Sequence, residues 1–171
     1  MVDAPSRSTD YRVELYLRKD TYGTYDAQQR VTDRLDELEA DGVLDAIGCD
    51  QWQGIQTMEY EHRSGALATY EEFQDWARHN DARLEPAFDQ RIQSKLDRTE
   101  TVEVVVFPVI SLAIYGGERL LAVFPCSVDD DHFTVRDCLA AFESGNVDRF
   151  LSRFAPRNVD RTTPHLQDAL V

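Results

Sequence analysis

The densest run of apolar positions lies between residues 102 and 124, where β-branched and aromatic residues flank Gly116 and Gly117. Two such runs joined by paired glycines predict a β-hairpin, because glycine reaches the positive φ angles of a tight turn without a Cβ clash. From Val104 onward neither arm alternates apolar with polar residues. This predicts a sheet buried on both faces, one of them beneath helices. Pro108 cannot donate to a ladder and marks either a bulge or a place where its strand loses a neighbour.

The pattern before this run predicts a β-α-β-β start. Residues 11–18 alternate apolar with polar, as in a half-buried strand. An apolar stripe at helical spacing then predicts a helix over 26–41, for which Thr24 and Asp26 are both candidate caps. Gly42 is placed to end this helix in a left-handed conformation. Strands are predicted at 43–52 and 55–60.

Two further helices and one ambiguous segment complete the chain. Thr69 and Glu72 match a capping box and predict a helix over 69–80. Thr134 and Gly145 bound a helix predicted over 134–145. The segment 86–96 fits a weakly amphipathic strand, and a helical interpretation fits almost as well. The strand is preferred because Pro86 interrupts the helical pattern.

These elements predict one α+β domain over residues 11–155, with a disordered leader at 1–10 and a frayed tail at 156–171. The sheet is expected to be antiparallel-rich, with the helices largely on one face and a ferredoxin-like β-α-β-β start. Strand edges in such a sheet favour a homodimer.

The charge indicates the setting in which this domain works. The chain carries 32 acidic against 18 basic residues, only two of them lysine, for a formal net charge of -14. An aspartate-rich surface with almost no lysine is typical of proteins from salt-loving archaea. At molar salt the Debye length falls to roughly 3 Å, so the self-repulsion of this surface is screened. The sequence has no basic stripe, and the nearest approach to one is the set Arg149, Arg153, Arg157 and Arg161. Because a phosphate backbone needs a positive patch, this disfavours direct DNA binding.

Cysteine usage and hydropathy predict a cytoplasmic protein. Cys49, Cys126 and Cys138 are odd in number and widely spaced, which predicts reduced thiols. The amino terminus lacks the apolar core of a secretory signal. The longest apolar stretch, 102–115, is shorter than the ~20 residues that span a bilayer.

One group of residues suggests chemistry. Cys126 and His132 flank one loop and could hold a metal, although paired zinc ligands normally lie two to four residues apart. Cys138, near the start of a capped helix, is a candidate nucleophile, but it shares the buried stripe of that helix. A metal- or thiol-dependent enzyme using Cys126, His132 and Cys138 is therefore the alternative hypothesis. The leading one assigns no catalytic residue, metal or cofactor.

A partner surface is predicted at Trp52 and Asp50. Both lie on one face of the strand predicted at 43–52, opposite Ile47 and Cys49. Trp52 is expected to project from the outer face, where a ligand or partner can stack on it.

Four segments, at residues 12–18, 30–45, 71–77 and 106–127, carry a family resemblance. They read RVELYLR, RVTDRLDELEADGVLD, EEFQDWA and VFPVISLAIYGGERLLAVFPCS, and they resemble a family of small haloarchaeal proteins often described as helix-turn-helix domain proteins. The resemblance covers about residues 11–145 and implies a role associated with transcription. The residues after Gly42 are expected to form a strand, where a helix-turn-helix needs a second helix.

Together these observations predict a non-enzymatic binding or regulatory module of a halophilic cytoplasm. It is expected to act through a protein or small-molecule partner, with transcription as the associated process.

Overall fold

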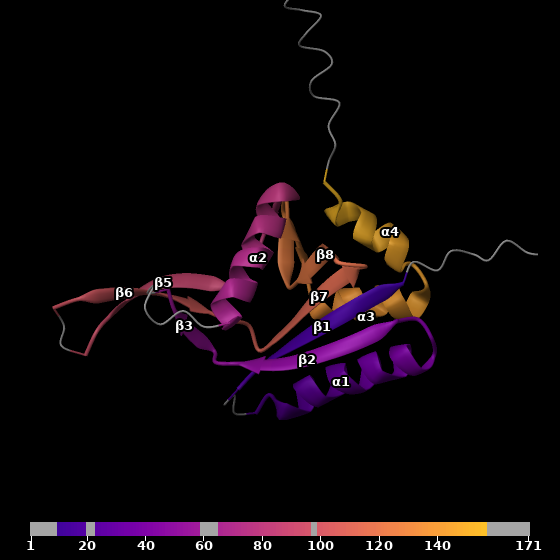
Figure 1. Cartoon of the computed structure of the whole chain (residues 1–171), viewed down its shortest axis with the longest axis horizontal. Helices are drawn as coiled ribbons and strands as arrows, with labels where there is room; N and C mark the ends of the chain where they lie inside the picture. Colours follow the sequence, from indigo (N-terminus) through magenta and orange to yellow (C-terminus); the bar gives the residue numbers. More distant parts are fainter. Residues whose placement is uncertain (1–9, 20–22, 59–64, 97–98, 157–171) are drawn as a thin grey trace, which may run out of the picture.

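A four-stranded sheet in the order β2-β1-β7-β8 lies at the centre of the computed structural model, which describes residues 10–19, 23–58, 65–96 and 99–156 (Figure 1). Its strands are β1 (Tyr11–Arg18), β2 (Ala46–Trp52), β7 (Ile110–Gly116) and β8 (Arg119–Phe124). Helix α1 (Tyr25–Ala40) connects β1 to β2, which run parallel, and the other pairs are antiparallel.

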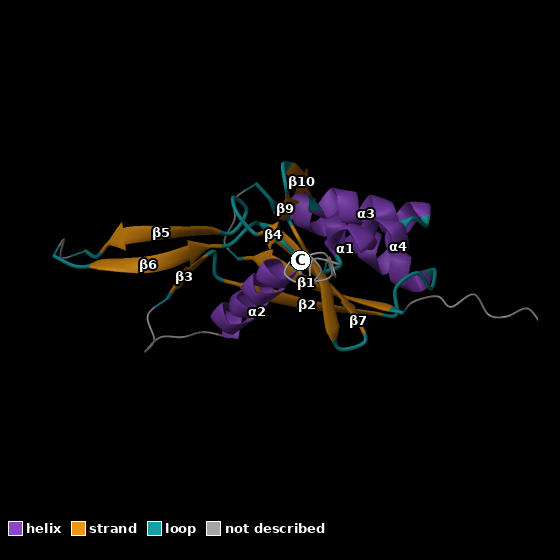
Figure 2. Ribbon diagram, turned by 90° about the horizontal axis from the view of Figure 1, so that it is seen from above, coloured by secondary structure: helices purple, strands orange, loops and turns teal. Residues whose placement is uncertain are grey.

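Two smaller sheets adjoin the central one. The first, in the order β3-β6-β5, consists of β3 (Ile55–Thr57), β6 (Thr101–Val106) and β5 (Asp89–Ser94). Strands β5 and β6 form a long hairpin, the arm, which projects from the body in both views (Figures 1 and 2). The second sheet consists of β10 (Asp131–Phe133), β9 (Cys126–Val128) and β4 (Ala82–Arg83). The strand preferred within 86–96 is therefore confirmed.

The fold class is confirmed as mixed α+β with mostly antiparallel sheets. The order of elements at the start is as predicted, but the pairing differs from a ferredoxin-like start. Strands β1 and β2 are direct neighbours, and β3 leaves their sheet to pair with β6. A ferredoxin-like unit would instead split its β-α-β with a strand between the parallel pair.

Helices cover both faces of the central sheet. On one face, Tyr11 of β1 meets Phe142 of α3 (Val135–Ser144) edge-on at 5.7 Å, and α1 contacts α3 through the Arg34–Glu143 ion pair. On the other face, Tyr16 meets Phe73 of α2 (Gly65–His79), also at 5.7 Å. The prediction of helices largely on one face is thus met by α1 and α3, whereas α2 covers the opposite face (Figure 2).

The apolar run at 102–124 is sheet, as predicted, but it belongs to two sheets. The part of the run before the glycines divides at Pro108 into two strands. The first, β6, belongs to the arm, and the second, β7, belongs to the central sheet. The break fits Pro108, because proline removes a ladder donor. Its neighbours bond elsewhere: the Phe107 amide donates to the Gly54 carbonyl at 2.8 Å, and the Val109 carbonyl accepts from the Arg18 amide at 3.0 Å.

The turn after β7 also differs in detail. Gly116 pairs with Arg119, so the two central residues are Gly117 and Glu118 and not the two glycines. Only Gly117 has a positive φ, of 64°.

Helix ends were predicted with mixed success. Thr134 forms a capping box with Asp137, and Gly42 and Gly145 adopt the left-handed conformation expected of them. The box predicted at Thr69 is wrong, because α2 already begins at Gly65 and the Thr69 hydroxyl donates back to the Gly65 carbonyl. Thr24 occupies the N-cap of α1 without a side-chain capping bond.

Most of the buried apolar residues between Tyr11 and Phe154 form one hydrophobic cluster. The predicted leader and tail fall outside the described residues, apart from Asp10 and Pro156. Within the described part of the chain, every helix is too short or too polar to cross a membrane.

Candidate functional site

The two helices that follow each other most closely are α3 and α4 (Val147–Leu151), joined by Gly145 and Asn146. Gly145 ends α3 at φ 78°, a conformation that costs a residue with a Cβ about 1 kcal/mol or more. The Asn146 amide then donates to the Ala141 carbonyl at 3.0 Å, which fixes the turn. Helix α4 continues directly into a 3₁₀ turn, Ser152–Phe154.

Aromatic rings anchor this helix pair to the body. Phe150 of α4 stacks on Phe124 of β8 with ring centroids 5.6 Å apart. Phe154 meets Phe133 of β10 edge-on at 4.9 Å and Phe124 edge-on at 5.2 Å. Because Phe154 is fully buried, the turn after α4 belongs to the core.

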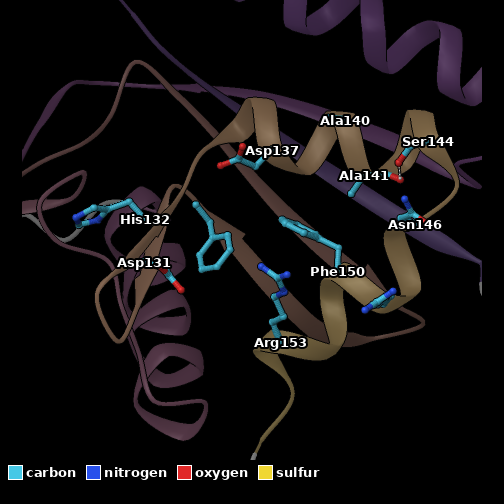
Figure 3. A pocket seen from close by; sticks show the side chains of 11 residues that line it. Asp131, His132, Asp137, Ala140, Ala141, Ser144, Asn146, Phe150 and Arg153 are labelled. Atoms are coloured by element: carbon cyan, nitrogen blue, oxygen red, sulfur yellow. Dashed lines mark hydrogen bonds between the residues drawn. The ribbon is translucent and has the colours of Figure 1, made fainter.

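A hollow of about 690 Å³ lies between β10, α3 and α4 (Figure 3). Its rim carries Asp131 and Asp137 on the side of β10 and the start of α3, and Arg149 and Arg153 on the side of α4. The Arg153 guanidinium lies 5.9 Å from the centroid of the Phe133 ring, within cation–π range. The hollow, called here the α3–α4 hollow, therefore combines aromatic rings with side chains of both charges in its lining.

The sequence pattern did not identify this hollow. The spacing of Arg149 and Arg153, one helical turn apart, was visible as part of the basic cluster of the tail. Only the fold brings these arginines into one lining with Asp131 and Asp137, which come from a different strand and helix.

The structure does not assemble Cys126, His132 and Cys138 into a reactive centre. His132 lines the α3–α4 hollow, and its Nδ1 lies 2.6 Å from the Ser127 Oγ (Figure 3). Burial raises the pKa of Cys126 to about 12 and holds the pKa of Cys138 well above its ordinary value. A nucleophilic cysteine needs the opposite shift. Among the described residues no three His, Cys, Asp or Glu side chains are grouped to hold a metal ion.

Thiol labelling should separate the three cysteines. Cys49 is exposed, whereas Cys126 and Cys138 are buried. We expect one thiol per native chain to react with a maleimide, and three after unfolding in urea. Because burial and then the nearby Asp50 raise the pKa of Cys49, this reaction should accelerate as pH rises through the alkaline range. The Cys49→Ser variant should lose the native reaction, and fast labelling that survives in it would contradict the burial of the other two.

The predicted partner surface at Trp52 and Asp50 is only half exposed. Asp50 lies in the open, opposite Tyr16 in the β1–β2 pairing. The expectation that Trp52 projects outward is wrong, because its side chain is only 4% exposed. It lies between the Tyr16 ring, stacked at 4.5 Å, and the Phe107 ring, tilted at 4.2 Å. Alternation did place both residues on one face of β2, but α2 covers the Trp52 end of that face through Phe73.

Tyr16 closes the same face beside Asp50. Burial, followed by the charge of Glu14, raises the pKa of Tyr16 to about 12, so its phenol stays neutral at ordinary pH. Arg12 pairs with Glu14 and lies 4.2 Å above the Tyr115 ring, and the Tyr115 hydroxyl donates to Glu72 of α2 at 3.2 Å. Arg12, Glu14 and Glu72 thus each have a partner on this face, and Asp50 lies exposed beside them.

Comparison with known families gives a match. A family model described as a helix-turn-helix domain matches residues 5–147. No curated protein and no solved structure matches at a significant level. The matched span includes α1, α2 and α3 and ends at the first residue of α4. Within the described part of this span, strands separate α1 from α2 and α2 from α3. The element that follows the turn at Gly42 is the strand β2, as predicted.

Proposed function

Because this chain belongs to the helix-turn-helix domain family, we propose that it is a non-enzymatic regulatory module that acts on transcription through a protein partner. We place the partner contact in the α3–α4 hollow and the protein in the cytoplasm of a salt-loving archaeon. The observation that carries this proposal is the shape of the α3–α4 pair, which offers a mixed-charge hollow and no recognition helix.

Direct reading of DNA is disfavoured by α4 itself. A helix-turn-helix reader lays its second helix in the major groove with several side chains on base edges. Helix α4 has five residues, of which Val147 and Leu151 are buried and Phe150 is packed on Phe124. Asp148 accepts a hydrogen bond from Tyr11. Arg149 is then the one exposed cation that α4 presents, on a chain of net charge -14.

The α3–α4 hollow supports a protein partner for a second reason. At molar salt, exposed ion pairs are screened to a few ångströms, so binding there depends on apolar contact. Phe150 and Phe133 supply that contact, while Arg149 and Arg153 in one part of the lining and Asp131 and Asp137 in another select the orientation of a partner segment that carries both charges. A small ligand with one aromatic ring is the competing occupant, because the volume falls in the usual range for ligand sites.

A mobility-shift assay in molar KCl tests the DNA half of the proposal. The protein alone should give no sequence-specific shift on promoter fragments from its source genome. A tight and sequence-specific shift would overturn the proposal in favour of direct readout.

Site-specific photocrosslinking tests the partner half. A benzophenone amino acid in place of Ala140, which lines the α3–α4 hollow, should give a discrete protein adduct in cytosol at molar KCl. The same group in place of Glu39, exposed on α1, is the matched control and should give none. Adding Arg149→Glu and Arg153→Glu should reduce the Ala140 adduct at least tenfold. Equal adducts at both positions, or none at either, would refute a partner in the hollow.

A further inference from the structure

The outer edge of β5 is open among the described residues. The arm sheet has the order β3-β6-β5, so β5 has a neighbouring strand on one side only. The arm carries this edge away from the body of the molecule, where a second chain can approach it (Figures 1 and 2). An accessible edge strand is a template for pairing unless charge, proline or a bulge blunts it.

The hydrogen bonds show which residues of β5 present their backbone outward. The Lys95 amide donates to the Glu100 carbonyl at 2.8 Å, so this pair is of the hydrogen-bonded kind. Hydrogen-bonded and non-bonded pairs alternate along an antiparallel ladder, and the β5–β6 register runs without a shift. Asp89, Arg91 and Gln93 therefore bond to β6. The backbone amides and carbonyls of Gln90, Ile92 and Ser94 point to the open edge.

The side chains of this edge also lack a cover. Ile92, at the middle of the outward-pointing set, is 75% exposed, and Leu96 just beyond β5 is fully exposed. Both are apolar residues on a projecting arm whose other exposed positions are polar or charged. An apolar side chain at the centre of an open edge is what a strand-to-strand contact would bury.

We propose that two copies of this chain join β5 to β5, antiparallel, about a two-fold axis at Ile92. The dimer has one continuous six-stranded sheet, β3-β6-β5 followed by the same three strands of the second copy in reverse. In this register Ile92 lies opposite its own counterpart, Gln90 lies opposite Ser94, and Arg91 lies opposite Gln93. At the ends of the pairing, Asp89 at the start of β5 comes opposite Lys95 just after β5, and the two carry opposite charges.

Charge excludes two neighbouring registers. Only the residues whose backbone amides and carbonyls point outward can form hydrogen bonds with the second copy. An alternative register must therefore still pair residues from the set Gln90, Ile92 and Ser94 with each other. Pairing Gln90 with Ile92 would bring Arg91 opposite Arg91. Pairing Ile92 with Ser94 would bring Arg91 opposite Lys95, again with like charges opposed.

Packing excludes a third register. Pairing Gln90 with Gln90 would require Phe88 to join the ladder opposite Ile92, but Phe88 is fully buried and its amide already donates to the Leu84 carbonyl. The register centred on Ile92 is thus the one that overlaps most of β5 without opposing like charges.

Oligomeric state at molar KCl tests the dimer. Light scattering after size exclusion should give twice the chain mass of 19.6 kDa at about 100 µM protein. Ile92→Asp should give a monomer with an unchanged circular dichroism spectrum. Its urea midpoint should equal that of the parent when both are measured at a protein concentration low enough for the parent to be monomeric, because residue 92 is exposed in the single chain. The matched control is Ile55→Asp on β3, the opposite edge of the same sheet, which should remain a dimer. A monomeric parent, or a dimer that Ile55→Asp and not Ile92→Asp dissociates, would overturn the proposal.

Disulfide trapping tests the register, in a Cys49→Ser background that removes the exposed native thiol. Ile92→Cys should form a disulfide-linked dimer under mild oxidation, because directly opposed hydrogen-bonded pairs have Cα atoms about 5.5 Å apart. Gln90→Cys should not, because its counterpart is four residues away along the strand, roughly 13 Å. Trapping through Gln90→Cys and not through Ile92→Cys would refute the axis at Ile92.

Discussion

Replacing Trp52 with alanine should lower the free energy of unfolding by about 3–5 kcal/mol, the range for deleting a large buried aromatic side chain. The indole is enclosed by Tyr16, Phe107, Phe73 and Phe88, with ring centroids between 4.2 and 6.4 Å away. Such a site cannot collapse easily, because its walls come from β1, from α2 and from the segments just before β5 and just after β6. Urea denaturation at molar KCl, followed by circular dichroism, measures the loss.

Two companion variants show whether the loss comes from burial. Trp52→Phe should cost less, about 1.5 kcal/mol or below, because phenylalanine fills most of the space and removes the indole N–H, which has no hydrogen-bond partner among the described residues. Asp50→Ala, on the same face of β2 but exposed, should stay within about 0.5 kcal/mol of the parent. If Trp52→Ala behaved like Asp50→Ala, Trp52 would be a surface residue and the original partner-surface prediction would be restored.

Replacing Phe154 with alanine should also cost about 3–5 kcal/mol. This residue lies beyond the span matched by the family model, yet it is fully buried and contacts Phe124, Phe133 and Phe150 at 4.9 to 5.5 Å. The same urea titration reports the effect, and the denaturant slope should stay near that of the parent if unfolding remains two-state.

Arg149→Ala is the matched control for Phe154→Ala. Arg149 lies in the same terminal segment but is exposed, so its removal should change the unfolding free energy by no more than about 0.5 kcal/mol. A loss below about 1 kcal/mol for Phe154→Ala would mean that the segment after α4 is not part of the core. In that case the domain would end near the boundary of the family match.

The position of the α3–α4 hollow relates these stability effects to function. Phe133 and Phe150 form its floor and also pack on Phe154 beneath it. Substitutions on the floor would therefore perturb folding and binding together, whereas Arg149 and Arg153 on the rim are exposed and can be changed separately. This is why the partner test uses the rim arginines and an exposed crosslinking position.

The sequence predicts several single helices and strands of this protein and where they end. Period-two alternation located β1, and a stripe at helical spacing located α1. Gly42 located the end of α1, and Thr134 and Gly145 located the two ends of α3. Each of these signals depends on side chains within one or two turns of each other, so the chain alone carries them.

The sequence does not predict which sheet a strand joins or which side chains are buried where these depend on residues far away in the chain. Pro108 was ambiguous between a bulge and a lost neighbour, and only the fold shows the strand dividing between two sheets. Trp52 was placed on the correct face of β2, but its exposure depends on α2, which the sequence does not position over that face. The α3–α4 hollow likewise forms only because the fold brings β10 next to α3 and α4.

The sequence by itself thus determined β1, α1 and α3, several helix ends and an acidic composition, because these follow from neighbouring residues and from residue counts. The tertiary structure alone decided which strands share a sheet, which face α2 covers and where opposite charges meet around a hollow. The physical reason is that burial and pairing are set by contacts between segments far apart in the chain, and one periodic pattern is compatible with several such partners.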